Sequence, residues 1–204
     1  MRIRPHNLGN YIVPDEVKNG ICLEIGANVG SFTEKYQNYF NKIHYYEPLK
    51  ECFELIQSKI NSPHITGFNL AGYKLSDKVL DMVLHSNKDS GSAGLKTDTL
   101  DKDWSDQAYQ QIQTISLEDM ISNLGNTQID YCKSDCETGE YHIFMNKDLT
   151  KINYLALELH NQMGSEKWYE LIDYISQTHT LISGNKNWTH NQNKDLFFKL
   201  STLT

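Results

Sequence analysis

The chain has 204 residues, a net charge of −7 and a pI near 5.6. This length suits one domain with a sizeable core, so a single domain is expected over residues 1–204. Hydrophobic residues make up 39% and charged residues 22%, which is ordinary for a globular protein in water. The acidic balance and scattered lysines provide no evident basic face, so nucleic acid is not an expected partner.

The first residues, MRIRP, are not followed by the apolar stretch of a signal peptide. No apolar run approaches the roughly 20 residues that cross a bilayer. We therefore expect a cytoplasmic protein without a membrane span. Cys22 and Cys132 lie in apolar, strand-like runs, and Cys136 has no second pair at zinc-finger spacing. Neither a disulfide framework nor a structural zinc site is expected.

Strand and helix patterns alternate after an N-terminal extension over residues 1–19. Short apolar runs bounded by glycine, proline or acidic residues predict strands, and apolar residues at helical spacing predict helices. The expected elements are a strand at 20–26, a helix at 29–40, a strand at 42–47, a helix at 48–60 and a strand at 64–73.

The polar segment 86–106 follows an edge or hairpin strand at 79–84 and is expected to form a lid or an acceptor-binding loop. The remaining expected elements are a helix at 115–124 after a short strand, strands at 129–133 and 154–159, a helix at 165–177, and a hairpin at 178–183 and 196–200. This alternation predicts a doubly wound, mostly parallel, Rossmann-like α/β sheet. The C-terminal hairpin adds an antiparallel edge strand.

The most informative segment joins the first strand to the first helix. It reads LEIGANVGSF and contains a Gly-x-Asn-x-Gly turn at Gly26, Asn28 and Gly30. Glycine permits a sharp turn, and the start of the next helix offers free N–H groups to an anionic ligand. Glu47 ends the second strand at close to the ~20-residue interval expected for an acid that binds ribose hydroxyls. Nucleotide cofactors and S-adenosylmethionine share that ribose, so both stay open.

Several blocks together resemble the FkbM family of class I methyltransferases. The blocks are LEIGANVGSF at 23–32, HYYEPLKE at 44–51, LSD at 75–77, SLED at 116–119, KSDCETGEY at 133–141 and ELH at 158–160. Their order along the chain is more specific than any single block. Three positions depart from the family pattern. Glu24 stands where an aspartate is usual, Thr138 stands where a glycine is favoured, and Lys74 stands where a small residue is common. These departures affect the expected shape of the pocket more than the class.

The resemblance implies S-adenosylmethionine as cofactor and assigns positions to it. The methionine part is assigned to residues 26–30, including Ala27, and to Ser31, while Glu47 is assigned to the ribose. Ser76 or Asp77 is expected near the adenine. Glu24 and Phe32, from the first block, complete the expected cofactor-binding set.

Four candidate residues fall at the predicted carboxyl ends of strands, where open parallel sheets bind ligands. They are Glu24, Glu47, Asp135 and His160. Asp135 is expected to face the methyl group and the acceptor, with Asp135, Glu137 and His160 as candidate bases. Asp135, Glu158 and His160 could also bind a divalent metal. A simpler interpretation is that Glu137 and Glu140 only cap the first turn of the next helix or place negative charge there. For Glu140 we expect this simpler role.

Three functions remain open at this point. The leading one is O-methylation of a hydroxyl on a small polar acceptor such as a saccharide, and the hydroxyl acceptor is implied by the family alone. The second is a dinucleotide-dependent oxidoreductase, although Asn28 occupies the place of the middle glycine in the Gly-x-Gly-x-x-Gly pattern. The third is a non-catalytic cofactor-binding module with a degenerate methyltransferase fold.

Overall fold

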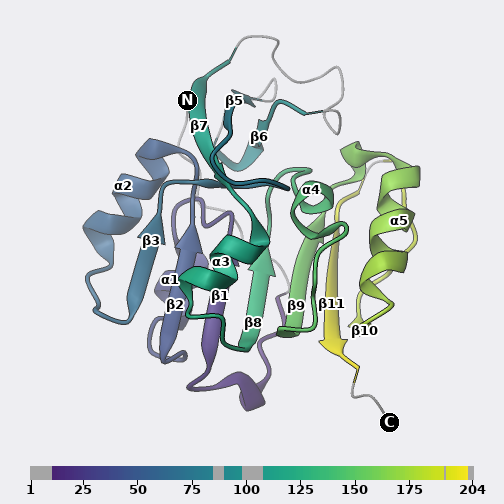
Figure 1. Cartoon of the computed structure of the whole chain (residues 1–204), viewed down its shortest axis with the longest axis horizontal. Coiled ribbons are helices and arrows are strands. Elements are labelled where there is room, and N and C mark those ends of the chain that lie inside the picture. The colour runs from purple at the N-terminus through teal and green to yellow at the C-terminus, as the bar shows by residue number, and fades with distance from the viewer. Residues whose placement is uncertain (1–10, 85–89, 98–107, 191, 202–204) are drawn as a thin grey trace.

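The computed structural model describes residues 11–84, 90–97, 108–190 and 192–201. Two sheets and five α-helices make up this part of the chain (Figure 1). The helices are α1 Ser31–Tyr36, α2 Lys50–Lys59, α3 Leu117–Asn123, α4 Glu140–Phe144 and α5 Ser165–Ile175. Short 3-10 turns lie at Asp15–Val17, Ser90–Ser92 and Asn161–Met163. No helix in these ranges is long and apolar enough to cross a membrane.

The larger sheet has seven strands in the order β10-β11-β9-β8-β1-β2-β3. Their bounds are β1 Ile21–Ile25, β2 Lys42–Tyr46, β3 Ile65–Phe68, β8 Ile129–Ser134, β9 Ile152–Leu159, β10 His179–Ser183 and β11 Lys194–Leu200. The five neighbouring strands β9, β8, β1, β2 and β3 are parallel to one another. The strand β11 runs antiparallel to both of its neighbours, β9 and β10. The doubly wound fold with its antiparallel C-terminal hairpin is confirmed. The strand order reverses between β1 and β8.

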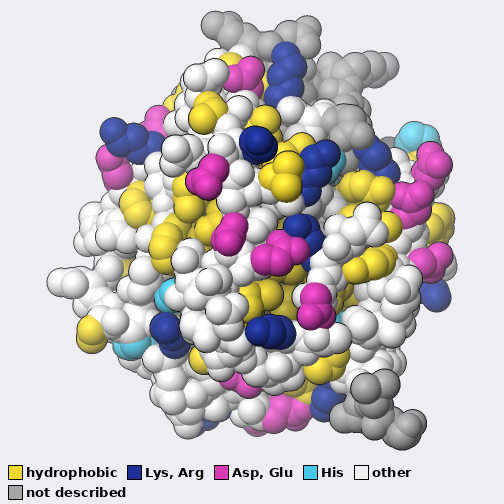
Figure 2. Space-filling view, in the orientation of Figure 1, with side chains coloured by type: hydrophobic (Ala, Val, Ile, Leu, Met, Phe, Trp, Pro, Cys, Tyr) yellow, Lys and Arg dark blue, Asp and Glu magenta, His cyan; other side chains and the backbone are white. Residues whose placement is uncertain are grey.

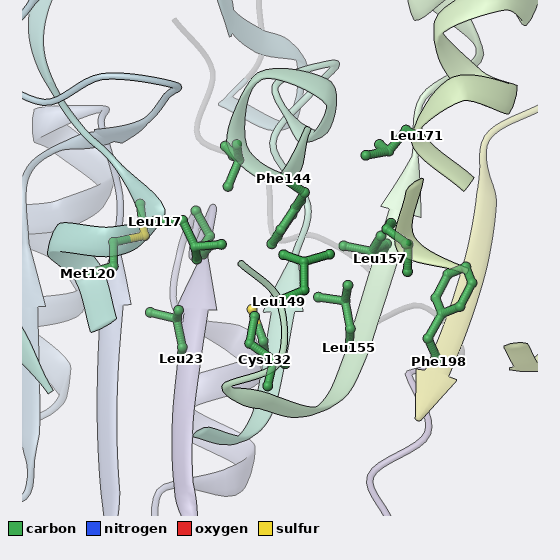
Figure 3. Close-up of a cluster of buried hydrophobic side chains, with 14 of the residues drawn as sticks. Leu23, Leu117, Met120, Cys132, Phe144, Leu149, Leu155, Leu157, Leu171 and Phe198 are labelled. Carbon is green, nitrogen blue, oxygen red and sulfur yellow. The ribbon is translucent and has the colours of Figure 1, made fainter. Parts of the chain in front are cut away.

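Each strand of the central sheet sends alternate side chains to opposite faces. One face, drawn in Figure 3, packs Leu23, Cys132 and Leu155 against α3, α4 and α5. The other face packs Cys22 and Tyr131 against aromatic residues of α1 and against the chain before β1. Helices on both faces explain why these strands read as nearly continuous apolar runs.

A smaller sheet lies over the carboxyl ends of the parallel strands (Figure 1). It has the order β4-β7-β5-β6, with bounds β4 Ala71–Gly72, β5 Val79–Leu84, β6 Ala93–Leu95 and β7 Gln110–Ile115. The strand β6 pairs with β5 inside the segment that we expected to be a loop. A loop is the wrong prediction for residues 90–95, which form a 3-10 turn and the strand β6, while residues 85–89 and 98–107 lie outside the described part of the chain.

The single strand expected at 64–73 is in fact two strands in different sheets. The side-chain amide of Asn69 donates hydrogen bonds to the carbonyls of Glu47 and Pro48, at 2.9 and 2.8 Å. This contact follows the end of β3, and the chain then enters the smaller sheet as β4. Two helix boundaries also differ, since α1 is shorter than expected and α3 starts after Ser116, whose hydroxyl accepts a bond from Asp119 N.

Candidate functional site

The turn between β1 and α1 is shaped by its contact with the neighbouring strand β8. Gly26 has a φ of 78°, in the left-handed region that favours glycine. A Cβ atom there would lie 1.9 Å from the backbone oxygen of Asp135. The N–H of Gly26 donates to Tyr46 O at 2.9 Å, and Asn28 is also left-handed at φ 51°. Glycine is therefore required at position 26 by both conformation and space.

Glu47 lies directly after β2, and its carboxylate faces the turn between β1 and α1. Its Oε2 accepts a hydrogen bond from Asn28 N at 2.6 Å, and its Oε1 accepts one from Leu49 N at 2.8 Å. Burial raises the pKa of Glu47 to about 8, against the lowering effect of the two N–H donors. Each carboxylate oxygen can accept a further hydrogen bond. Glu47 is thus fixed in place and still able to bind hydroxyl groups.

A cavity opens at the reversal of strand order, under the smaller sheet. Its wall contains the polar residues Asn28, Glu47, Ser90, Asp135 and Glu137 and the apolar residues Ile25, Tyr46, Pro48, Leu49, Ala71, Met82, Ala93, Leu95 and Cys136, with Gly26, Gly72, Gly91, Gly94 and Gly139. Glu47, Asp135 and Glu137 therefore share one cavity.

Lys133 connects the carboxyl ends of β1 and β8 from a fully buried position. Its Nζ donates to Gly26 O at 2.8 Å and lies 3.8 Å from Glu24 Oε1 and 3.7 Å from Asp135 Oδ2. The ammonium also lies 5.5 Å from the centre of the Tyr11 ring. Burial lowers the pKa of Lys133, but Asp135 and Glu24 outweigh it and raise the pKa above its usual value. Lys133 is therefore paired with two carboxylates.

Glu24 belongs to this buried charge network and is not part of the cavity wall. Its Oε2 accepts a hydrogen bond from the hydroxyl of Thr33. Burial raises the pKa of Glu24, and the charge of Lys133 lowers it. Glu24 thus links β1, α1 and Lys133, and its contact with the cofactor stays a prediction.

Asp135 and His160 form a buried cluster with Glu137 and Glu140, which we call the carboxylate–histidine cluster. The Nε2 atom of His160 lies 3.5 Å from Glu137 Oε2 and 3.7 Å from Asp135 Oδ1. Its Nδ1 atom lies 3.4 Å from Glu140 Oε1, which accepts a bond from Cys136 N at 2.6 Å. Glu140 therefore does more than charge a helix turn, because its side chain is fully buried and faces the imidazole.

The cluster shifts the protonation of its members. Burial lowers the pKa of His160, but the facing carboxylates of Glu137 and Glu140 outweigh burial and raise it well above its usual value. Burial raises the pKa of Glu137, and the charge of His160 opposes that effect. The facing carboxylates therefore favour the protonated imidazole over the neutral one, which makes His160 the weakest of the three candidate bases.

Four more residues expected to contact the cofactor are outside the cavity wall. They are Ala27, Gly30, Ser31 and Phe32. A Cβ atom on Gly30 would lie 2.8 Å from Ile56, so this glycine serves the packing of α1 against α2. The ring of Phe32 stacks on Tyr131 at 5.9 Å between centroids. Gly30 and Phe32 thus pack against α2 and β8, next to the turn and outside the cavity.

Ser76 and Asp77 do not line the cavity. The hydroxyl of Ser76 donates to Asp119 and accepts a bond from Ser116 N at 2.9 Å, so it ties this loop to the start of α3. The adenine contact expected there stays a prediction, although it was made from a third strand that was extended too far. Because that strand ends at Phe68, it is Ala71 and Gly72 that enter the wall.

Glu158 differs from its expected place among metal ligands. It accepts a hydrogen bond from the side chain of Asn193 at 3.2 Å. The group of ligand atoms within 4.8 Å of one another consists of Asp135, Glu137 and His160. Sequence reasoning also missed the cavity residues of β5 and β6, because the segment around Gly94 reads as a polar loop and its pairing with β5 is long-range.

The face seen in Figure 2 carries acidic and basic side chains interspersed with hydrophobic ones. Within the described part of this face the basic side chains form no continuous patch. The sheet order and the placement of the cavity define a Rossmann-like α/β protein with its candidate site at the carboxyl edge of the sheet.

A profile of the methyltransferase FkbM domain matches residues 24–187, and the chain belongs to this family. An FkbM methyltransferase from Methylobacillus flagellatus KT has a similar structure, with a TM-score of 0.53 and 13% identity over 94% of this chain and 45% of that one. A protein of the NADB-Rossmann superfamily from Streptococcus agalactiae gives a TM-score of 0.50 at 12% identity, over 92% and 64% of the two chains.

The protein SMU.776, solved with SAH, gives a TM-score of 0.50 at 8% identity, over 88% of this chain and 45% of that one. At these identities the structural likeness concerns the fold. This chain spans between 45% and 64% of the length of these three structures. No curated protein matches the sequence.

Proposed function

We propose that this chain transfers a methyl group from S-adenosylmethionine to a hydroxyl group of a small polar acceptor, with a saccharide as the leading candidate. The observation that carries the proposal is the shared cavity wall of Gly26, Asn28, Glu47 and Asp135 in a member of the FkbM family. The complex of SMU.776 with SAH supports the choice of cofactor. Nothing in the cavity identifies the acceptor, so its class rests on the family.

The residues present fit an adenosine-containing cofactor. Glu47 is buried, held by two N–H donors and turned to the cavity, which suits an acceptor for two ribose hydroxyls. Apolar side chains of Leu49, Met82 and Leu95 line the same cavity and suit an adenine ring. When bound, S-adenosylmethionine supplies an electrophilic methyl group. The chain itself must hold both partners in line, which can contribute about 7–11 kcal/mol to lowering the barrier.

Asp135 is the residue proposed to face the acceptor hydroxyl. Its Oδ2 accepts a hydrogen bond from the Tyr11 hydroxyl at 3.2 Å and lies near Lys133, so the side chain is held from that side. A hydroxyl acceptor must lose its proton as the new bond to carbon forms, and a nearby carboxylate can orient the hydroxyl and accept that proton. Glu137, in the same wall, is the second candidate because burial raises its pKa.

Cofactor binding gives the first test, and Glu47→Gln is the informative variant. Glutamine keeps the size but replaces one acceptor oxygen with an NH₂ donor, so it should weaken binding of S-adenosylmethionine by about 1–3 kcal/mol, or roughly 5- to 150-fold. Isothermal titration calorimetry of wild type and variant measures this. Glu51→Gln is a matched control, because Glu51 is an exposed acid of α2 outside the cavity wall.

The same titrations separate the competing functions. Wild type that binds a nicotinamide dinucleotide and not S-adenosylmethionine contradicts the proposal and favours an oxidoreductase. A chain that binds S-adenosylmethionine but transfers no methyl group to any of a broad panel of hydroxyl compounds is a cofactor-binding module. Equal affinity in wild type and Glu47→Gln removes Glu47 from the ribose site.

A further inference from the structure

We propose that Asp135, Glu137 and His160 form a binding site for one divalent cation in the wall of the cavity. One ligand atom from each residue lies within 4.8 Å of the other two. Asp135 and Glu137 line the cavity, and His160 lies behind them with no exposed surface. One imidazole and two carboxylates form a mixed nitrogen and oxygen ligand set of the kind that binds Mn²⁺ or Zn²⁺.

The imidazole of His160 is the observation that points to a ligand. Neither ring nitrogen forms a hydrogen bond with any described residue, although the ring is completely buried. Buried polar atoms are nearly always paired. The separations of 3.5 and 3.7 Å from Nε2 to Glu137 and Asp135 are too long for hydrogen bonds. Nε2 therefore points at two carboxylate oxygens without bonding directly to either.

Those separations are slightly longer than those of atoms that share one ion. Two ligand atoms each about 2.1 Å from an ion lie about 3.0 Å apart at an octahedral angle and about 3.4 Å apart at a tetrahedral angle. Nε2 of His160 would approach both carboxylates by a few tenths of an ångström on binding an ion in tetrahedral geometry. Oδ1 is the carboxylate oxygen of Asp135 that faces His160, whereas Oδ2 faces Tyr11 and Lys133.

The other side of the imidazole faces a carboxylate, as is usual for metal-binding histidines. Nδ1 of His160 lies 3.4 Å from Oε1 of Glu140, which is held by Cys136 N at 2.6 Å. A carboxylate that accepts the Nδ1 proton leaves the Nε2 lone pair for the ion. Glu140 is thus a positioning residue. If methyl transfer is the function, as proposed above, an ion here could bind acceptor oxygens beside Asp135.

Direct binding of Mn²⁺ to the full, metal-stripped chain tests the site without an activity assay. Calorimetry and electron paramagnetic resonance should show one Mn²⁺ per chain, displaced by Zn²⁺. Glu137→Gln should weaken Mn²⁺ binding at least 10-fold, and Glu140→Gln by about 10- to 100-fold. Glu118→Gln should bind Mn²⁺ like wild type, because Glu118 pairs with Lys147 on the surface of α3. Thermal melts check that each variant is folded.

Paramagnetic broadening of the His160 ring signals in wild type gives a second measurement that needs no variant. Folded wild type that takes up neither Mn²⁺ nor Zn²⁺ at millimolar concentration overturns the proposal and leaves the cluster as a buried ion pair. Unchanged Mn²⁺ affinity in a folded Glu137→Gln, or no broadening at His160, also overturns it by placing the ion elsewhere. Binding of S-adenosylmethionine to the metal-free chain is measured in parallel, so the two proposals fail separately.

Discussion

Asp135 lies near Tyr11, Lys133 and His160 and is proposed to act in turnover. An interaction that matters mainly in the transition state lowers kcat and kcat/KM together when it is removed. We therefore predict that Asp135→Asn lowers both by about 10²- to 10⁴-fold and leaves the affinity for S-adenosylmethionine nearly unchanged. Asparagine keeps the size and can still accept the bond from Tyr11, but it cannot accept a proton.

Steady-state kinetics with an acceptor found by screening measures the effect of Asp135→Asn. Asp130→Asn is the control from the same strand β8. Its carboxylate accepts a bond from Ile21 N at 2.8 Å, so the change affects only stability. A folded Asp135→Asn enzyme with wild-type turnover contradicts the role of Asp135 and makes Glu137 the better candidate.

Gly26 shows how a single backbone position determines the shape of the site. We predict that Gly26→Ala lowers the free energy of unfolding by more than the roughly 1–2 kcal/mol that a left-handed alanine costs, because its Cβ also meets Asp135 O at 1.9 Å. Gly125→Ala separates the two effects. Gly125 has a φ of 89° but no atom within 4 Å of its Cβ position. Urea unfolding of both variants should rank Gly26→Ala as the less stable, and equal losses contradict the clash.

At the scale of elements, Lys133 holds the ends of β1 and β8 together beside the cavity. Removing one partner of a buried ion pair leaves uncompensated charge, here on Glu24 and Asp135, and costs about 3–5 kcal/mol. We predict a loss of this size in the free energy of unfolding of Lys133→Met. Lys147→Met is the comparison, because Lys147 pairs with the largely exposed Glu118 and such pairs contribute about 0–1 kcal/mol. Similar losses in urea unfolding of the two variants contradict the prediction.

The elements that could be predicted from sequence are those whose pattern is local. The run ICLEI and the turn after it contain their own strand, glycine and helix signals, and Glu47 was placed correctly because it ends a similar run. The strand at 79–84 was predicted, but the smaller sheet was missed because β5, β6 and β7 join through long-range pairs. The burial of Glu140 could not be predicted either, because it depends on the packing of α4 against the sheet.

The whole molecule contains a buried, titratable side chain far from the cluster. His44 lies in β2 with 4% of its surface exposed and its ring 5.4 Å from that of Phe68. Its Nδ1 forms no hydrogen bond with any described residue. Burial, assisted by the charge of Lys42, lowers the pKa of His44 to about 4. The folded protein therefore holds this imidazole neutral where an unfolded chain protonates it, since histidine in a flexible chain titrates near ~6.5.

This difference gives the stability of the molecule a defined dependence on pH. Between about pH 6.5 and 4 the unfolded chain binds the extra proton, so the contribution of His44 falls as the pH falls, with a slope of at most about 1.4 kcal/mol per pH unit. Glu47 acts in the opposite direction, because its folded pKa of about 8 lies above the unfolded value and its contribution is lost as the pH rises toward 8. The effect of His44 must therefore be measured as the difference in the free energy of unfolding between wild type and a variant that lacks this histidine.

We predict that His44→Gln flattens the decline in stability between pH 6.5 and 4 relative to wild type, because glutamine does not titrate. Urea unfolding at pH 7, 5.5 and 4.5 measures the two curves. His190→Gln should follow the wild-type curve, since His190 is exposed on the loop before β11. If the His44→Gln and wild-type curves stay parallel over this range, the imidazole of His44 is protonated in the folded state, and the buried, neutral form inferred from its surroundings is wrong.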